Sequence, residues 1–436
     1  METSKISPTF CVYPWMEFIV GPTSHIKICC IAETAVEDEN KRVYNFEEDS
    51  IEEYWNSWGL RQIRKKMLAG EKIKACGHCY YQESIGRTSY RQSFNREWFE
   101  SEHGKNVLNR IEKSKKNGFK VEEPPLYLDI RPGNLCNLKC RMCNPGNSSK
   151  IYQEQKEMLK SAEKEITPLI DTGYFKRDEK RFHNWYKSEK IWKNIYKWAP
   201  NSKKLYFTGG EPTLIKENWD LIDYLKKNGY SKNIHLIFNL NCTQVPDKLI
   251  DTFETFSTVT LSLSIDGYNT VQEYMRYPSK WPKIEKNIIK LLNHRKQNTY
   301  FYFTPVVQIY NILDLPNLFK WFDSLQINYG NIRSSIIICT TPKFLDIATL
   351  PNNIKKEALL RIKKYENSYT GKDYFLLENL NAIKNVLKKE ENQETEHNLK
   401  KFYKYTQLLD KKRGNSFKRT FPELNQLFEE DGRWKN

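Results

Sequence analysis

Short apolar segments that alternate with longer helical stretches constrain the fold more than any other feature of this sequence. Each segment has the length of a strand, and each is followed by enough residues for a helix. The predicted strands are residues 126–130, 204–208, 234–240, 258–265, 300–308 and 336–339. Such alternation favours a parallel sheet with crossover helices, and six units are too few to close an eight-stranded barrel. We therefore expect an α/β fold built on a partial, TIM-like (β/α)6 barrel.

Further segments flank or interrupt this predicted barrel. Changes in composition, and the Pro124–Pro125 pair, mark the boundaries between them. We expect a cysteine-rich module at 1–103, a linker helix at 104–124, the barrel at 125–341 with a helical insertion at 148–200, and a charged helical region at 342–436. Within the first module, residues 49–71 predict one amphipathic helix that Ser50 could cap.

The overall composition is that of a folded protein, with 39% hydrophobic and 14% aromatic residues. No run of about 18 apolar residues occurs, and the start lacks the features of a secretory signal, so we expect a cytoplasmic protein without a membrane partner. The net charge of +16 leaves a nucleic-acid partner open, because Lys and Arg neutralise phosphates. Many lysines nevertheless lie in mixed-charge stretches such as 384–401, where a solvated face is expected.

The ten cysteines fall into two groups and two isolated positions. A cytoplasmic compartment keeps thiols reduced, so a disulfide framework is not expected. One group lies in the first fifth of the chain, and the other is a tight triplet near residue 140. Two separate groups of thiols indicate two separate metal sites. The isolated Cys242 and Cys339 lie on apolar strands and are expected to be buried thiols.

The triplet consists of Cys136, Cys140 and Cys143, in a loop that follows the first predicted strand. A cubane cluster has four irons, so three thiolates leave one iron free to bind a substrate or cofactor. A structural zinc site normally has four protein ligands, and no further Cys or His follows within the next several residues. The spacing therefore favours a catalytic iron–sulfur cluster over zinc.

The triplet sequence CNLKCRMC resembles the CxxxCxxC cluster loop of the radical S-adenosylmethionine (radical SAM) enzymes. The segment Gly209-Gly210-Glu211-Pro212, after the second predicted strand, resembles the glycine-rich segment with which that family binds the amino group of the methionine moiety. Taken alone, this segment would be only a turn. The resemblance implies that Gly209, Gly210 and Glu211 bind the cofactor.

A third match begins at Ser264, at the end of a predicted strand, and continues to Arg276. The resemblance implies that Ser264 lies near the ribose and Arg276 near the carboxylate of S-adenosylmethionine, with Asn241 as a further ribose candidate. Met142 stands where many relatives carry an aromatic ring beside adenine, and a thioether can pack there too. Separately, these residues suit turns and surface charges, but all of them follow strands whose carboxyl ends share one edge of the sheet.

The N-terminal group of cysteines resembles the auxiliary-cluster module called twitch or SPASM, which commonly follows the barrel and here precedes it. Its thiols are Cys11, Cys29, Cys30, Cys76 and Cys79. Four thiolates can hold a second 4Fe-4S cluster, although the same arrangement suits zinc. Strand alternation points Cys29 and Cys30 to opposite faces, so only one should bind metal, and the motif favours Cys29.

Together the resemblances imply an oxidoreductase-type radical SAM enzyme that cleaves S-adenosylmethionine reductively to a 5′-deoxyadenosyl radical. A flavodoxin or ferredoxin would supply the electron, and the substrate would be a peptide or protein. Two alternatives remain open. The substrate could be a nucleotide or nucleic acid, or the chain could be a non-catalytic, zinc-stabilised binding module.

Overall fold

The computed structural model describes residues 6–84, 88–160, 164–175, 185–330, 332–371 and 374–433. Parts of the predicted insertion, residues 161–163 and 176–184, lie outside the described residues. The chain forms two compact units. The first unit comprises Met1–Leu135, Asp178–Phe238 and Thr255–Ser257, and the second comprises Cys136–Arg177, Asn239–Glu254 and Thr258–Asn436.

The first unit combines the cysteine-rich module with the first strands of the predicted barrel. Its strands are β1 (Glu17–Val20), β2 (Ile26–Lys27), β3 (Tyr127–Ile130), β4 (Lys204–Phe207) and β5 (His235–Leu240). Its helices are α1 (Tyr13–Met16), α2 (Ile51–Trp55), α3 (Trp58–Leu68), α4 (Gly77–Ser84), α5 (Tyr90–Glu100), α6 (Gly104–Lys116), α9 (Glu189–Trp198) and α10 (Lys216–Lys227), with 3-10 turns at η2 (Lys74–Cys76), η5 (Trp185–Lys187), η6 (Ala199–Asn201), η7 (Pro212–Leu214) and η8 (Tyr230–Asn233).

The predicted single helix at 49–71 is wrong, because α2 and α3 are separate helices. Ser50 caps α2 in a capping box with Glu53, as expected, but Ser57 begins a new helix by accepting from the Leu60 N–H. The apolar spacing continues through residues 49–71, but the second serine cap within this stretch divides it into two helices.

Strand register gives the sheet of the first unit one apolar and one polar face. β1 pairs parallel with β3, β3 with β4, and β4 with β5, while β2 pairs antiparallel with β1. Side chains alternate between the two faces of a strand, so residues in register share a face. The aligned residues Phe18, Leu128, Leu205 and Leu236 are almost fully buried on one face. The buried carboxylates of Glu17 and Asp129 lie on the other face.

The second unit contains the cluster loop, the later strands and the C-terminal helices. Its strands are β6 (Thr258–Leu263), β7 (Thr299–Phe303), β8 (Val306–Val307), β9 (Ile332–Ser334) and β10 (Ile337–Ile338). Its helices are α7 (Ser149–Lys160), α11 (Asp247–Thr255), α12 (Thr270–Met275), α13 (Trp281–Asn293), α14 (Leu315–Tyr329), α15 (Asn352–Ser368), α16 (Tyr374–Leu387), α17 (Gln393–Arg413), α18 (Phe417–Thr420) and α19 (Pro422–Asp431), with 3-10 turns at η3 (Lys164–Leu169), η4 (Thr172–Phe175), η9 (Ile309–Asn311), η10 (Lys343–Leu345) and η11 (Ile347–Thr349).

The strand order β2-β1-β3-β4-β5-β6-β7-β9 describes an eight-stranded sheet that is mostly parallel and, over the described residues, not closed into a barrel. This confirms the predicted open α/β architecture. The first four predicted strands are confirmed within two residues at their ends. The fifth, 300–308, is confirmed only in its first half, because β7 ends at Phe303 and Val306–Val307 form the separate strand β8. The sixth, 336–339, is a strand, β10, but its expected place in the main sheet is wrong: the main sheet continues at β9, and β10 pairs with β8 in a separate two-stranded sheet.

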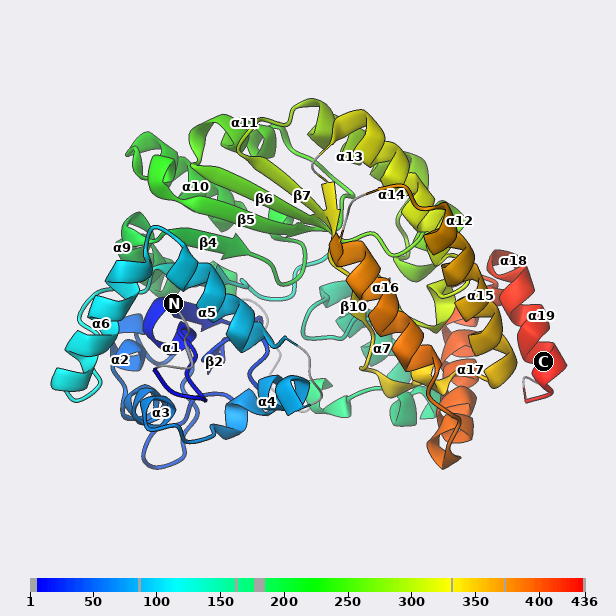
Figure 1. Cartoon of the computed structure of the whole chain (residues 1–436), viewed down its shortest axis with the longest axis horizontal. Coiled ribbons are helices and arrows are strands. Elements are labelled where there is room, and N and C mark those ends of the chain that lie inside the picture. Colours follow the sequence, from blue (N-terminus) through cyan, green and yellow to red (C-terminus); the bar gives the residue numbers. More distant parts are fainter. Residues whose placement is uncertain are drawn as a thin grey trace. The chain divides into compact units, whose positions relative to one another are not determined.

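The region after residue 342 is helical, as expected. Within it, α15 packs against α16 and α19, and α18 packs against α19. Figure 1 shows these helices as the orange-to-red group that includes the C-terminus. None of the helices that the structure describes is both long enough and apolar enough to cross a membrane.

Candidate functional site

The loop between β3 and α7 brings the three predicted cluster cysteines together. Cys136 and Cys140 pack with Leu138 in one buried group, against which Met142 and Cys143 are also packed. Two serines at the start of α7 stabilise the loop backbone. The Ser148 hydroxyl donates to the Leu138 carbonyl at 2.7 Å, and the Cys136 N–H donates to the Ser149 hydroxyl at 3.3 Å. The triplet therefore lies in one compact loop, with Cys136 and Cys140 in a single buried group and Cys143 packed against it.

Burial makes these thiols unfavourable places for negative charge. It raises the pKa of Cys140, while the guanidinium of Arg276 acts in the opposite direction. Burial also raises the pKa of Cys143, and the neighbouring thiols of Cys140 and Cys136 raise it further. Because the thiolate is the form that binds metal, a cationic centre would have to stabilise the bound state of this loop.

Arg276 lies beside the triplet and is ion-paired in the interior. Its Nη1 is 3.9 Å from the Cys140 sulfur, and its Nε donates to Asp266 Oδ2 at 2.6 Å. Asp266 is fully buried, and its other oxygen accepts from the Val306 N–H at 2.8 Å. Asp266 lies within the matched segment between Ser264 and Arg276, but the sequence assigned no role to it. The structure places it as the anion that fixes Arg276 next to a predicted cluster ligand.

Asn241 is tied to the cluster loop through Asn137. The Asn241 amide donates to the Asn137 side-chain oxygen at 2.8 Å, and the Asn137 amide donates to the Thr243 hydroxyl at 2.8 Å. Ser264 follows β6, and its N–H donates to the Leu240 carbonyl at 2.8 Å. The sequence did not single out Asn137, because an asparagine inside a loop is ordinary and only its position between two cysteines distinguishes it.

The glycine pair of the first unit lies directly against the backbone that leads into the triplet. A Cβ added to Gly210 would lie 2.1 Å from the Leu135 carbonyl oxygen, and Gly209 has φ +114°. The N–H of Glu211 donates to that same carbonyl at 2.8 Å. The Glu211 carboxylate, which is 1% exposed, accepts from the Thr213 hydroxyl at 2.6 Å. Packing of the loop backbone thus requires a glycine at 210, independently of any ligand.

The N-terminal thiols gather around a small cavity in the first unit. Its lining includes Cys11, Cys29, Cys76 and Cys79, together with His78 and Arg91. Cys11 precedes α1, Cys29 lies in the turn after β2, and the other two lie in η2 and α4. The pKa of Cys11 is raised by burial and then by Cys76 and Cys79, which shows that these sulfurs share one environment.

Cys30 is not among the residues that line this cavity. Burial raises its pKa to about 12, and the charged groups that act on it are Glu17, Arg131 and Asp129. The strand β2 ends at Lys27, so the two adjacent cysteines lie in a turn rather than in the predicted strand. They nevertheless have different surroundings, and Cys29 is the one that lies with the other thiols.

Two residues of α5 hold the segment that carries Cys11. Arg91 donates from Nη1 to the Phe10 carbonyl at 2.7 Å, and it is ion-paired with Glu83 at 2.6 Å. Asn95 donates to the same carbonyl at 2.9 Å and accepts from the Val12 N–H at 2.8 Å. No motif in the sequence marks these residues, because they lie some 80 positions from Cys11 in the chain.

The cysteines of each group would supply sulfur ligands, and thiolate sulfur is the usual ligand of iron–sulfur clusters. Within the described part of the chain, no three Cys, His, Asp or Glu side chains converge closely enough to hold a single metal ion. In the type and number of their donors, the loop with three thiols suits an open cluster, and the cavity with four suits a fully ligated one.

Family comparisons match the two regions separately. Residues 130–322 match the model of the radical SAM superfamily, and residues 11–80 match the model of an iron–sulfur cluster-binding domain, SPASM. The first match contains the triplet, the glycine pair and Arg276, and the second contains all five N-terminal cysteines. No curated relative matches the chain.

Several solved structures are distantly similar. Native anSMEcpe with bound AdoMet is 16% identical, with a TM-score of 0.38 over 58% of this chain and 64% of that chain. Streptococcus suis SuiB bound to S-adenosylmethionine is 13% identical, with a TM-score of 0.34 over 71% of this chain and 60% of that chain. The aligned parts span less than two-thirds of those chains, and similarity this low assigns no role to any residue here.

Proposed function

Since this chain belongs to the radical SAM superfamily and carries a SPASM-type cluster-binding domain, we propose that it cleaves S-adenosylmethionine reductively and modifies a peptide or protein. The observation that carries the proposal is the division of the thiols into two groups. Each lies inside the domain whose family binds an iron–sulfur cluster, and one group offers three sulfurs while the other offers four.

We assign Cys136, Cys140 and Cys143 to the cluster that binds S-adenosylmethionine. Three thiolates leave one iron without a protein ligand, which is the site where the cofactor would bind. When bound, the cluster and S-adenosylmethionine supply a one-electron cleavage that yields methionine and a 5′-deoxyadenosyl radical. The contribution of the protein is to hold the loop, exclude water and orient the substrate.

We assign the residues that follow the strands to the parts of S-adenosylmethionine that the family resemblance implies for each of them. Glu211 and the backbone at Gly209 and Gly210 suit the ammonium of its methionine moiety. The hydroxyl of Ser264 and the amide of Asn241 suit the ribose, and Met142 suits the adenine through its apolar thioether. Arg276 suits the carboxylate, with Asp266 holding its guanidinium in place.

We assign Cys11, Cys29, Cys76 and Cys79 to an auxiliary cluster. The cavity that they line supports this set, and it supports Cys29 over Cys30. Four thiolates would complete the coordination of this cluster, so its role would be electron transfer or structural support rather than direct binding of the substrate. A flavodoxin or ferredoxin would reduce the first cluster.

The proposed substrate class rests on the match to the SPASM-type domain. The radical SAM enzymes with this module that the sequence resembles often modify peptides or proteins. A nucleic acid is the second candidate, favoured by the net charge of +16. A protease degrades a peptide or protein substrate, and a nuclease degrades a nucleic acid. Treating a cell extract with each enzyme in turn therefore distinguishes the two classes.

The experiment is anaerobic incubation of the enzyme with S-adenosylmethionine, a reductant and fractionated cell extract. The readout is 5′-deoxyadenosine formed above the level without extract. The proposal predicts that stimulation is lost after protease treatment of the fraction and survives nuclease treatment. Loss with nuclease alone, together with steep dependence on salt, would instead identify a nucleic-acid substrate.

A further inference from the structure

The C-terminal helix α17 contacts the cluster loop at its middle residues, although it lies beyond the matched superfamily region, which ends at residue 322. The contacts involve residues 139–141, which include the central cysteine of the triplet. All of these residues belong to the second unit.

The first contact is a buried ion pair. Arg141 follows Cys140 directly and is fully buried. Its Nη2 donates to Asp410 Oδ1 of α17 at 2.5 Å, and its guanidinium lies 3.6 Å from the ring centroid of Tyr274. A cation is thus fixed inside the loop that carries the cysteines.

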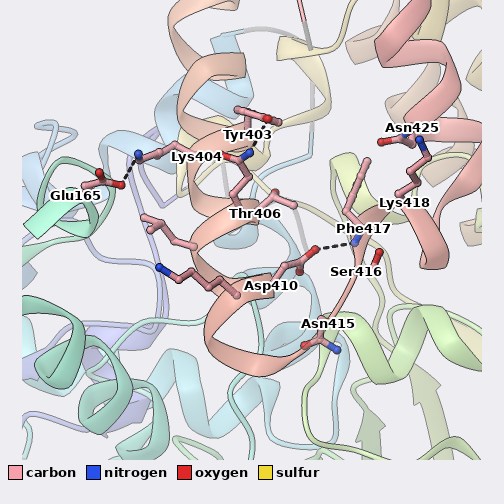
Figure 2. Close-up of a pocket in the computed structure, with 13 residues that line it drawn as sticks. Glu165, Tyr403, Lys404, Thr406, Asp410, Asn415, Ser416, Phe417, Lys418 and Asn425 are labelled. Atoms are coloured by element: carbon pink, nitrogen blue, oxygen red, sulfur yellow. Dashed lines mark hydrogen bonds and ion pairs between the residues drawn. The ribbon is translucent and has the colours of Figure 1, made fainter. Parts of the chain in front are cut away.

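Asp410 uses both of its oxygens. Besides Arg141, Oδ1 accepts from the Tyr274 hydroxyl at 2.8 Å, and Oδ2 accepts from the Phe417 N–H at 2.6 Å. Figure 2 shows this second bond at the edge of a cavity of about 560 Å³, where α17 turns into α18. Asp410 therefore joins the cluster loop to α12 and to the start of α18.

The second contact binds the loop backbone. The hydroxyl of Tyr405, five residues before Asp410 on α17, donates to the Arg141 carbonyl at 2.7 Å. The Arg141 N–H donates to the Met275 carbonyl at 2.9 Å. Both backbone groups of Arg141 are thus satisfied, and one of them depends on α17.

The third contact is a buried network that reaches the loop through α7. Arg413 donates to Glu154 from Nη2 at 2.6 Å and from Nε at 3.1 Å, and both side chains are 1% exposed. Lys139 of the loop is paired with the same carboxylate at 3.2 Å. Burial would raise the pKa of Glu154, but Arg413 and Lys139 lower it, so the carboxylate stays ionised between two cations.

We propose that α17 positions the cluster loop and that Asp410 tunes the charge around the cluster by holding and compensating Arg141. This inference rests on the proposed function in one respect, the assignment of the triplet to a cluster. Asp410 and Tyr405 act through Arg141 and are positioning residues. The reduction potential of an iron–sulfur cluster depends on nearby charge and hydrogen bonding, so a cation fixed beside Cys140 is in a position to influence it.

The test uses three full-length variants. Asp410→Asn removes the charge but keeps an acceptor, and Tyr405→Phe removes only a hydroxyl. Glu396→Gln is the matched control, because Glu396 lies on the same helix in an exposed ion pair with Lys400.

Amide hydrogen exchange of residues 136–143 is measured first, in metal-free protein. We expect amide exchange in this segment to be about five- to tenfold faster in Asp410→Asn and Tyr405→Phe than in wild type. Asp410→Asn keeps only one of the two acceptor oxygens that Asp410 uses, and Tyr405→Phe loses the hydroxyl that bonds the Arg141 carbonyl. The control should match wild type. Unchanged exchange in both variants would overturn the positioning role.

The reduction potential of the cluster is measured second, in reconstituted protein. Loss of the Asp410 charge leaves Arg141 less compensated, which favours the reduced cluster, so the potential of Asp410→Asn should move to a more positive value. Tyr405→Phe, which is neutral, should move it less. A potential unchanged from the control would refute the tuning role. If wild type held no cluster while exchange responded as expected, the proposed function would fail and the positioning role would stand.

Discussion

The Nη1 atom of Arg276 lies 3.9 Å from the sulfur of Cys140, and the buried carboxylate of Asp266 holds it there. This relationship joins a residue that the sequence assigned to cofactor binding with a residue that it assigned to the cluster. It also creates a buried ion pair, whose removal from one side is costly.

We expect Arg276→Met to destabilise the protein by about 3–5 kcal/mol, because it leaves the fully buried Asp266 without its cation. Urea unfolding measures this loss, and binding of S-adenosylmethionine should weaken in parallel. The control is Lys290→Met, which breaks the exposed pair with Asp247 and should cost less than about 1 kcal/mol. Equal costs for the two variants would show that the Arg276 pair is not buried in solution.

Cys29→Ala and Cys30→Ala form a matched pair of neighbouring substitutions. Wild-type protein reconstituted anaerobically should hold about eight irons per chain, in two clusters. Cys29→Ala should lose the auxiliary cluster and retain about four irons, whereas Cys30→Ala should retain about eight. Iron and sulfide analysis decides between them. The reverse pattern would mean that Cys30 is the ligand, and zinc in place of iron would support the structural alternative.

Gly210→Ala should disturb the start of the cluster loop, because Gly210 packs against the backbone of Leu135. The added Cβ would lie 2.1 Å from the Leu135 carbonyl oxygen, which cannot rotate away, and such overpacking costs about 1–3 kcal/mol. Because Leu135 precedes Cys136, we expect faster loss of iron to a chelator. Gly229→Ala is the control, since Gly229 has φ +75° but no neighbour within 4 Å. Iron loss at the same rate in both variants would argue against the packing explanation.

Acidification should destabilise the protein through His235. Burial and then the charge of Lys204, its cross-strand partner, lower the pKa of His235 to about 4. The unfolded chain, with a His pKa near 6.5, therefore binds the proton more readily, and stability falls as the pH decreases from about 6.5 to about 4. The loss should reach about 2 kcal/mol at pH 5. His235→Gln should remove this component, and an unchanged pH profile in that variant would contradict it.

The parts of the fold that follow from local pattern were predictable. The four leading predicted strands are short, apolar and separated by helices, and the cysteine spacing marks both thiol groups. The short strand β1 was missed because Glu17–Val20 has no period that distinguishes it from a turn of helix. β9 was missed because Ile332–Ser334 is less apolar than the neighbouring segment that forms β10.

Long-range contacts in the site were not predictable. Asp410 lies 269 positions from Arg141, and nothing in either local sequence connects them. The sequence assigned Gly210 to cofactor binding, and the structure adds a second reason for a glycine there, the close approach of the Leu135 backbone. Contacts of this kind arise from tertiary packing, and they cannot be predicted from the local pattern of a single sequence.

The central claim is that the loop of Cys136, Cys140 and Cys143 holds a cluster with one iron open to S-adenosylmethionine. The most direct test is 5′-deoxyadenosine formation by anaerobic, reduced protein, measured by liquid chromatography and mass spectrometry for wild type and Cys140→Ala. The account predicts formation by wild type that requires S-adenosylmethionine and reductant, and none by the variant. Formation at the wild-type rate by Cys140→Ala would contradict it.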